Sequence, residues 1–579
     1  MSTEAAAPQR LHVNQLGYLT GGPKAATLES AADESVVFVL VGPDGRALAT
    51  GRTEPRGVEP TAGAAVHVID FSAVSTPGTG LRLVADGATS PPFAVGDDLY
   101  APLRDDAIAM FVGQRSGVPI DDRLGAGYAR PAGHVDVAPN RGDGAVGPLP
   151  AGAATTPGGV DLYEGWTGDY VIDGRGGWYD AGDQGKYVVN GGIAVAQLLG
   201  LHERDLRLGG PGVSAALDEA RFELEWMLRM QVPAGLPLAG MVHHKLTDEH
   251  WTPLPTLPHL DPQRRFLHRP STAATANLAA VAAQGARVLA ADDPTFAARL
   301  LAAARTAYAA ALANPRWAFP DTNVLANAGG GPYDDPELDD ELYWAAAELY
   351  LTTGEQGYLA DLRANPFHVG GAKHPYAAKG FDWQDVAAWA HLQLATVPSA
   401  LPERDEVRAG LLAEADRLAA IGDRQPFGHL YAPADDAYAW GSNAMVANCA
   451  ALVAGASEVS GDGRHRDAAL AGIDYLLGRN ALGLSYVTGY GTRYAHHQHS
   501  RWYGPELDPA LPPPPRGTLA GGPNTGRQDP VAAALPPGTP AQRCYVDDIQ
   551  AFSLNEMTVN WNAALAWLAA FAARPGGLV

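Results

Sequence analysis

The stretch GGWYDAGDQGKYVVNGG, residues 176–192, decides how the rest of the chain is interpreted. It places two carboxylates, Asp180 and Asp183, three residues apart in a glycine-rich turn beside aromatic residues. Glycines allow tight backbone conformations, so both acids can point at one spot, where each perturbs the pKa of the other. Such pairs also occur in structural turns, because Asp side chains bend and cap the chain locally. The interleaved aromatic residues favour a catalytic turn, since their faces suit the apolar faces of sugar rings.

A second motif, NEMTVNWNAALAW, spans Asn555 to Trp567 near the C-terminus. The two motifs, in this order, resemble the signatures of glycoside hydrolase family nine, the inverting cellulases with an (α/α)6-barrel fold. The resemblance covers most of the chain. It implies Glu556 as the general acid, Asp183 as the base, and Asp180 as a residue that helps to hold the attacking water. Taken alone, Glu556 also fits an ordinary first-turn glutamate stabilised by the helix dipole.

Composition indicates a globular chain of more than one domain. With 579 residues, 46% of them hydrophobic and 18% charged, the chain is too long for one ordinary core and too apolar for disorder. No apolar run reaches the length of a transmembrane helix. A net charge of −23 argues against nucleic acid and anionic membranes, which need clustered Lys and Arg. An uncharged polysaccharide fits that charge best.

The cysteines and the N-terminal residues give information on the cellular compartment of the protein. Cys449 and Cys544 are the two cysteines, which excludes a disulfide scaffold. A single bridge stays open, although buried free thiols are the simpler interpretation. The first residues, MSTEAAAPQR, show neither a basic nor an apolar leader segment. We therefore expect a cytoplasmic protein, with secretion after removal of a leader as the alternative.

Residues from about 10 to 97 carry short apolar or alternating runs separated by PDG, GP and PGTG turns, which predicts a small β-sandwich. VNQLGY, from Val13 to Tyr18, resembles the opening of the immunoglobulin-like domain that precedes one branch of family-nine catalytic domains. We expect this domain to support the enzyme rather than to bind cellulose. The predicted fold is thus multidomain: an immunoglobulin-like β-sandwich over 8–97 and an all-α (α/α)6 barrel over 98–576.

Beyond Asp98 the pattern is helical. Apolar residues at helical spacing predict helices, with Ser271 as an N-cap of one of them, over 216–231, 271–290, 339–353, 404–421, 441–458, 465–478 and 558–573. No strand alternates with them, which disfavours a doubly wound α/β sheet. The proline-rich segment 503–543 is either a low-complexity linker or, as we expect, a loop folded over the barrel mouth.

Further residues are candidates for sugar contacts. GTRYAHHQHSRW, residues 491–502, resembles the family's H-P-H-H-R motif, which implies that His499 and Arg501 hydrogen-bond sugar hydroxyls. Gln498 and Ser500 depart from that motif, and His497 can share the role; three histidines otherwise suggest a metal site. The resemblance also implies that His244, Trp251 and Trp440 are subsite walls.

The sequence bears on two metal sites, one for calcium and one for zinc. YDDPELDDE, residues 333–341, crowds acids around a Pro turn, and the resemblance implies a structural calcium site formed by Asp335, Glu337, Asp340, Glu341 and Asp385. A solvated acidic loop is the alternative. The same branch often carries a Cys2His2 zinc, but three of the four matching places hold non-ligands, Ser116, Gly133 and Tyr179, and only His134 remains. We therefore predict no zinc.

These inferences combine into an inverting endo-β-1,4-glucanase that cleaves cellulose, cellodextrins and related β-glucans. An exo-acting relative, such as a cellobiohydrolase, cellodextrinase or exo-glucosaminidase, is the first alternative. A catalytically inactive glycan-binding protein is the second, and the intact Asp180, Asp183 and Glu556 argue against it. No organic cofactor is implied, the expected partner is the glucan substrate, without nucleic acid or membrane, and we expect a monomer.

Overall fold

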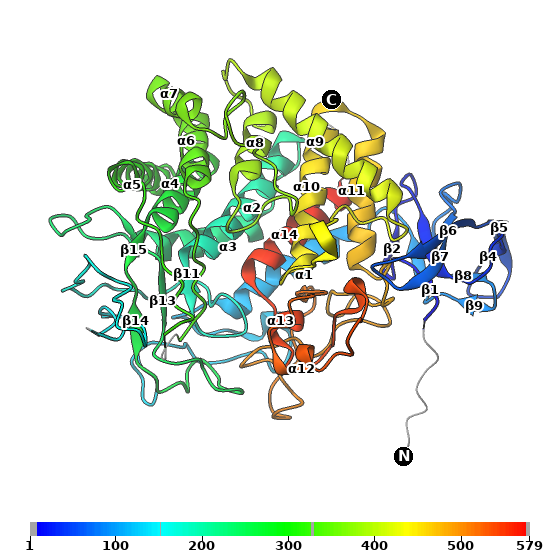
Figure 1. The fold of residues 1–579 in the computed structure, drawn as a ribbon, viewed down its shortest axis with the longest axis horizontal. Helices are drawn as coiled ribbons and strands as arrows, with labels where there is room; N and C mark the ends of the chain where they lie inside the picture. The colour runs from blue at the N-terminus through cyan, green and yellow to red at the C-terminus, as the bar shows by residue number, and fades with distance from the viewer. Residues whose placement is uncertain (1–8, 151, 326–328, 575–579) are drawn as a thin grey trace.

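The computed structural model describes residues 9–150, 152–325 and 329–574. Figure 1 shows a β-domain at the N-terminal side, drawn in blue, that lies against one flank of a larger helical domain. The last strand of the β-domain ends at Val95 and the first helix of the other domain begins at Tyr100. The outer ends of the two predicted domain ranges lie outside the described residues, namely residue 8 and residues 575–576.

The β-domain is a sandwich of two sheets, as predicted. One sheet has the order β1-β3-β7-β6, and the other has β2-β10-β8-β4-β5 with β9 beside β8. Alternate residues of the strands point inward and form a core of their own around Phe38, Leu83 and Phe93. The strands are β1 (Leu11–His12), β2 (Gly17–Tyr18), β3 (Ala25–Glu29), β4 (Val37–Val41), β5 (Ala47–Arg52), β6 (Glu54–Glu59), β7 (Ala64–Asp70), β8 (Gly78–Ala85), β9 (Ala88–Thr89) and β10 (Phe93–Val95).

The helical domain closes into a double ring. Six helices form the inner ring, in which each contacts the next and the last contacts the first: α2 (Val188–Arg207), α4 (Thr272–Val288), α6 (Asp339–Thr353), α8 (Ala387–Thr396), α10 (Ser442–Ser460) and α14 (Val559–Ala573). Six others pack outside them: α1 (Tyr100–Gln114), α3 (Ser214–Arg229), α5 (Pro294–Ala313), α7 (Gln356–Ala364), α9 (Arg404–Arg424) and α11 (Gly463–Leu476). This is the predicted (α/α)6 barrel.

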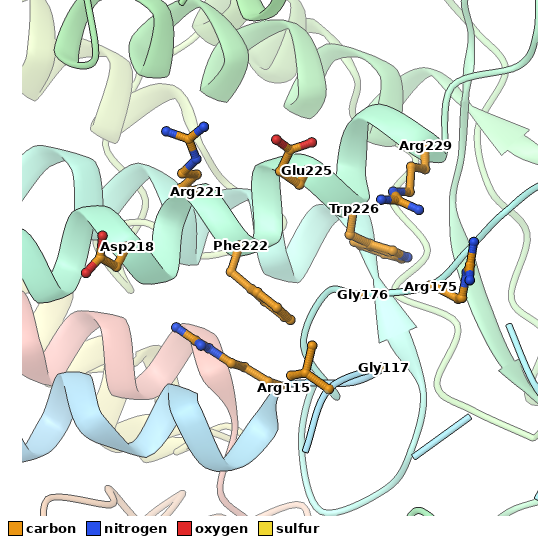
Figure 2. Close-up of a pocket in the computed structure, with 11 residues that line it drawn as sticks. Arg115, Gly117, Arg175, Gly176, Asp218, Arg221, Phe222, Glu225, Trp226 and Arg229 are labelled. Carbon is orange, nitrogen blue, oxygen red and sulfur yellow. The ribbon is translucent and has the colours of Figure 1, made fainter. Parts of the chain in front are cut away.

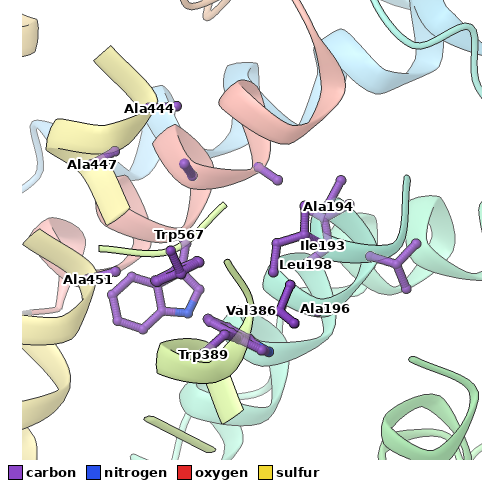
Figure 3. Close-up of a cluster of buried hydrophobic side chains, with 14 of the residues drawn as sticks. Ile193, Ala194, Ala196, Leu198, Val386, Trp389, Ala444, Ala447, Ala451 and Trp567 are labelled. Atoms are coloured by element: carbon purple, nitrogen blue, oxygen red, sulfur yellow. The ribbon is translucent and has the colours of Figure 1, made fainter. Parts of the chain in front are cut away.

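The core fills the centre of the inner ring (Figure 3). Small residues of α2 and α10, such as Ala196 and Ala451, lie beside two large side chains, Trp389 of α8 and Trp567 of α14. Trp389 is completely buried, and a Cβ added at Gly200 would lie 2.8 Å from its ring, so α2 approaches α8 through a glycine. The inner helices are therefore apolar on nearly all sides, as helices enclosed by others must be.

Short strands under the mouth of the barrel are a feature that the helical pattern did not predict. β11 (Lys186–Tyr187) pairs with β13 (Lys245–Asp248), which pairs with β14 (Arg265–Leu267), and β12 (Val242–His243) pairs with β15 (Pro270–Ser271). They are only two to four residues long, too short for periodicity to reveal them. They matter because β11 directly follows the Asp180–Asp183 turn.

The segment 503–543 joins the two domains as well as bordering the mouth. Gln542 donates to Thr61 of the β-domain (2.7 Å), whereas Gly521 donates from its backbone to the carbonyl of Glu556 (3.0 Å). The segment is thus a folded loop, not a linker. A second contact between the two domains lies at the end of α11, where the backbone N–H of Gln15 donates to the Leu477 carbonyl (2.9 Å).

Most local predictions agree with the structure. The Ser271 hydroxyl caps α4 by accepting from Ala274 N (3.1 Å), and α6 has the predicted bounds. Cys449 and Cys544 are buried free thiols. Across the described residues, none of the helices has the length and apolar character that crossing a membrane requires.

Candidate active site

The Asp180–Asp183 turn is fixed between helices α1 and α2. The Gln114 side chain at the end of α1 donates to the carbonyls of Tyr179 (3.1 Å) and Ala181 (2.9 Å). The Asp180 amide donates to the Gly185 carbonyl (2.9 Å), which closes the turn. Both carboxylates thereby stand at the N-terminal end of α2, at the barrel mouth.

Backbone hydrogen bonds bring the second motif and the histidine motif onto this turn. Val559 N donates to the Asp180 carbonyl (2.9 Å) and Arg501 N to the Gly182 carbonyl (3.0 Å). His499 N donates to the carbonyl of Asn555 (2.9 Å), the residue before Glu556. A Cβ at Gly182 would lie 2.3 Å from the His499 carbonyl oxygen, so this close approach requires glycine. Three segments far apart in sequence therefore meet at one place.

Asp180 is held by two side-chain donors. Asn190 of α2 donates to Oδ1 (2.6 Å), and the Tyr333 hydroxyl donates to Oδ2 (2.7 Å). Burial raises the pKa of Asp180 to about 7, and the charge of Asp183 adds to that rise, while the two hydrogen bonds oppose it. Asp180 therefore titrates near neutral pH and has a fixed orientation.

Asp183 lies beside Tyr187 and a buried lysine. Its Oδ2 accepts from the Gly185 amide (3.1 Å) and from the Tyr187 hydroxyl (3.4 Å). Lys245, opposite Tyr187 in the β11–β13 pair, donates to the carbonyls of Gly330 (3.3 Å) and Gly331 (2.6 Å). Burial lowers the pKa of Lys245 to about 7, while Asp183 opposes that shift. The lysine thus supports the segment that carries Tyr333 and lies close enough to feel the Asp183 charge.

Glu556 occupies the position expected of an acid. It follows the short helix α13 (Phe552–Asn555), precedes α14, and is partly exposed toward the cleft. Desolvation and the nearby charge of Asp183 together raise the pKa of its carboxyl to about 8, against the opposing effect of Arg501. A carboxyl that stays protonated at neutral pH can donate a proton.

His499 and Arg501 lie beneath the acid and bind each other. His499 Nδ1 lies 2.5 Å from the Ile549 carbonyl, and its Nε2 lies 2.6 Å from Arg501 Nη1. The carbonyl requires a proton on Nδ1, so Nε2 accepts from the guanidinium. Arg501 Nε donates to the Thr252 carbonyl (3.0 Å). Both side chains are more than nine-tenths buried, and direct sugar contact by them stays a prediction.

The carboxylates open into a cleft of about 600 Å³ that crosses the barrel mouth. Trp251 and Trp440 line it, 48% and 36% exposed, as expected of subsite walls. Sequence reasoning missed further aromatic walls, among them Tyr333 and Trp383, whose rings pack edge to face at 5.0 Å. Trp383 had a usable signal, because it stands a few residues before α8, much as Trp440 stands before α10.

His244 does not form a wall, contrary to the prediction. It is completely buried, stacks on Phe319 with ring centroids 3.9 Å apart, and bonds to Ser271 Oγ (2.8 Å) and the Pro332 carbonyl (3.0 Å). It therefore supports the 331–333 segment from behind. The motif places the residue correctly in sequence but does not say which way the ring faces.

A second hollow, of about 630 Å³, lies on the flank of α3, away from the carboxylates (Figure 2). Four arginines line it, and each has an acidic partner: Arg115 with Glu219, Arg175 and Arg229 with Asp173, and Arg221 with Asp293. Because each guanidinium is already paired and none of Asp180, Asp183 and Glu556 lines this hollow, it is a poor candidate for the reaction.

The predicted calcium ligands divide into two groups. Asp335, Asp340 and Glu341 are buried together, and four of their carboxylate oxygens have no hydrogen-bond partner among the described residues. Burial and their mutual repulsion raise the pKa of Asp335 to about 8, and burial raises that of Asp340 to about 7. Glu337 and Asp385 instead pair with lysines, Lys373 (2.5 Å) and Lys379 (2.7 Å). The first three residues concentrate buried negative charge, whereas the other two pair with lysines that each bind a second acid as well.

The four places matched to the zinc site also meet, around the Tyr179 hydroxyl. That hydroxyl bonds to His134 Nδ1 (2.7 Å), and a Cβ at Gly133 would lie 2.5 Å from it. Ser116 lies in the adjoining turn, where its amide donates to the Gly177 carbonyl (2.8 Å). One imidazole nitrogen and two hydroxyls, without a thiolate, do not make a zinc donor set.

Comparison with known proteins covers both domains. Residues 100–569 match the profile described as glycosyl hydrolase family 9, and residues 6–90 match the cellulase N-terminal ig-like domain. The chain is 53% identical to endoglucanase C of Cellulomonas fimi, over 98% of this chain and 52% of that protein. It is 39% identical to a cellulose 1,4-beta-cellobiosidase of Acetivibrio thermocellus, over 97% of this chain and 67% of that protein.

A solved structure agrees with these matches. A thermostable endoglucanase from Alicyclobacillus acidocaldarius, solved as a single mutant, superposes with a TM-score of 0.82 at 30% identity and covers 98% of this chain and 100% of its own. The chain spans about half the length of the C. fimi enzyme, so that protein has parts without a counterpart here. The sequence match, the two-domain architecture and the carboxylates at the barrel mouth agree: the chain belongs to glycosyl hydrolase family 9.

Proposed function

We propose that the chain is an inverting endo-β-1,4-glucanase acting on cellulose-type β-glucans. Hydrolysis with inversion needs an acid that protonates the leaving oxygen and a base that activates a water on the opposite ring face. Glu556 is the acid in this proposal, and Asp183 is the base. Asp180, oriented by Asn190 and Tyr333, holds the water beside it. The observation that carries the proposal is the meeting of these carboxyls in one aromatic-lined cleft.

The position of the tryptophans supports endo action. In the inner ring, α4 and α10 are opposite each other, and Trp251 precedes α4 whereas Trp440 precedes α10. The carboxyls stand before α2 and α14, between those two positions. A glucan chain lying from one tryptophan to the other extends to both sides of the scissile bond. An exo enzyme needs one of these sides closed.

Aromatic walls also support an uncharged substrate. Trp383 and Tyr333 face the cleft from the α6–α8 side, and flat rings bind the apolar faces of glucose units without requiring charge. The A. thermocellus relative is named a cellobiosidase, and release of cellobiose by an exo-acting enzyme is therefore the alternative.

One assay separates endo from exo action, and a second tests inversion of the anomeric configuration. An endo enzyme lowers the viscosity of carboxymethylcellulose strongly for few new reducing ends, whereas an exo enzyme releases ends with little change in viscosity. Cellohexaose digested in an NMR tube should first give the α-anomer at the new reducing end. An initial β-anomer contradicts inversion.

Glu556→Gln tests the acid. General acid catalysis contributes about 10²- to 10⁴-fold, so the variant should lose that much kcat on cellohexaose and far less on an aryl cellobioside with a good leaving group. Glu225→Gln, on α3 and away from the cleft, is the matched control and should retain full activity. Equal losses on both substrates contradict the assigned role.

We further propose that Asp335, Asp340 and Glu341 bind a structural Ca²⁺. The support is their burial, their charge and their unpartnered oxygens, since hard carboxylate oxygens suit this ion. The ion would hold the start of α6 and, through it, the Tyr333 segment. Added Ca²⁺ should raise the melting temperature of the chelator-treated protein, and the Asp340→Asn variant should lose that response; an equal response in the variant refutes the site.

A further inference from the structure

A second group of potential ligands lies behind the catalytic turn. His134, Asp248 and Asp261 come from the 131–136 segment, the end of β13 and the 256–264 loop, and their side chains are buried. One donor atom from each lies within 4.8 Å of the others. In the part of the chain that the structure describes, this is the one group of three or more His, Cys, Asp or Glu that meets this criterion.

The imidazole of His134 presents an unused nitrogen to this group. Nδ1 is occupied by the Tyr179 hydroxyl at 2.7 Å, whereas Nε2 is buried without a hydrogen-bond partner among the described residues. The nearest carboxylate oxygen, Asp248 Oδ1, is 3.8 Å from Nε2, too far for a hydrogen bond. A buried nitrogen left without a hydrogen-bond partner is unfavourable, so the arrangement is incomplete without something between these atoms.

The two carboxylates are oriented by other residues. Asp248 accepts from Arg265 Nη1 (2.6 Å) and from the Thr252 hydroxyl (2.6 Å), and Asp261 accepts from the Gln263 amide (2.8 Å). Asp261 has no ion-pair partner among the described residues although it is 1% exposed. A buried carboxylate without a cation is unfavourable, so a positive charge in this space stabilises the fold.

We propose that His134 Nε2, Asp248 and Asp261 bind a divalent transition-metal ion. The distance of 3.8 Å between Nε2 and Oδ1 is close to the separation of two ligands that each lie about 2.1 Å from one ion. Ligating imidazoles usually donate their other N–H to a fixed acceptor, and ligating carboxylates accept further hydrogen bonds. Tyr179, Arg265 and Thr252 supply those contacts.

This site differs from the position that corresponds to the family's Cys2His2 zinc site. That position lies on the Nδ1 side of the His134 ring, where Tyr179 stands. Its effect is positional, because Tyr179 directly precedes Asp180 in the catalytic turn. Thr252, which bonds to Asp248, also accepts from Arg501 through its carbonyl. The ion would fasten three loops beneath the active site and take no part in proton transfer.

The test measures binding and is independent of glucan hydrolysis. The full chain is stripped with a chelator and saturated with Ca²⁺, which occupies hard-ligand sites such as the Asp335–Glu341 cluster. Zn²⁺ and Mn²⁺ are then titrated by calorimetry, and Co²⁺ binding is followed by visible absorption. One equivalent should bind and raise the melting temperature. No stoichiometric binding of any of these ions overturns the proposal.

Two variants and one spectroscopic measurement assign the ligands. Asp261→Asn and His134→Gln should each weaken the binding by about 100-fold or more, whereas Asp340→Asn should leave it unchanged. Unchanged binding in Asp261→Asn rejects the site. X-ray absorption on the Zn²⁺-loaded wild type gives an answer even if a variant does not fold: one imidazole with oxygen ligands supports the proposal, and two or more imidazoles place the ion elsewhere.

Discussion

Removing the hydroxyl of Tyr333 should weaken catalysis without disturbing the cleft. The ring packs edge to face against Tyr187 (4.7 Å) and Trp383 (5.0 Å), and phenylalanine preserves both contacts. Tyr333→Phe therefore removes the 2.7 Å hydrogen bond to Asp180 Oδ2, together with the 3.2 Å hydrogen bond that Asn190 donates to the same hydroxyl. Asp180 keeps its bond from Asn190 (2.6 Å) but becomes free to rotate its other oxygen.

The size of the effect follows from the charge on the acceptor. A hydrogen bond to an ionised group contributes about 1.5–3 kcal/mol, which corresponds to about a 10- to 150-fold loss of kcat if the bond is needed in the transition state. The bond also lowers the pKa of Asp180, so its removal should raise that pKa above its present value of about 7. Asp180 must be ionised to hold the water, and the acid limb of kcat/KM should therefore move to higher pH.

The assay is the pH dependence of kcat and KM on cellohexaose from pH 5 to 9. We expect the loss in kcat to exceed the change in KM and to be larger at pH 6 than at pH 8. Tyr343→Phe is the control, because Tyr343 is a buried tyrosine of α6 whose hydroxyl bonds to His368 (3.1 Å) outside the cleft. A Tyr333→Phe enzyme with less than a threefold loss, or with an unmoved acid limb, would falsify the role assigned to this hydroxyl.

Three further outcomes are expected. The kcat/KM profile of the wild type should be a narrow bell with limbs near pH 7 and 8, because Asp180 must lose its proton while Glu556 keeps its own; activity constant to pH 10 contradicts the assignment. Lys245→Met should lower kcat about tenfold or more and speed hydrogen exchange over residues 329–334, since two buried carbonyls lose their donor; unchanged exchange argues against this support. Tyr545→Phe should lower kcat more than it changes KM, because its hydroxyl bonds to Asn555 beside the acid, and an unaltered kcat excludes that coupling.

The sequence predicted the parts of this structure that depend on local pattern. Helical spacing located seven helices to within a few residues, namely α3, α4, α6, α9, α10, α11 and α14, and β-alternation identified the sandwich, because both periods follow from backbone geometry alone. The closing of six helices into a ring depends on which helices contact each other, and only the family resemblance supplied that. The two-residue strands β11 and β12 lie below the length at which any period is visible.

The proposed catalytic carboxyls could be named from sequence, but their hydrogen-bond partners could not. Asp180 and Glu556 stand in recognisable motifs, whereas Tyr333 reaches Asp180 from 153 positions away, a pairing that only the fold creates. His244 shows the opposite limit, since its motif was recognised and the direction of its ring was not. Side-chain direction depends on neighbours such as Phe319, which carry no signal in the histidine motif.

The way in which Glu556 is positioned explains why the β-domain belongs to this enzyme. The acid lies between two helices in extended backbone, where no helical hydrogen bond fixes it. Its preceding residue, Asn555, is held by Tyr545 and donates to the His497 carbonyl (2.7 Å). Tyr545 follows Arg543, which pairs with Glu29 of β3 (2.6 Å) and donates to the Ala62 carbonyl (2.7 Å). A loop is mobile unless a rigid body supports it, and here the sandwich is that body, so the placement of Glu556, the proposed proton donor, depends on contacts that lie outside the barrel.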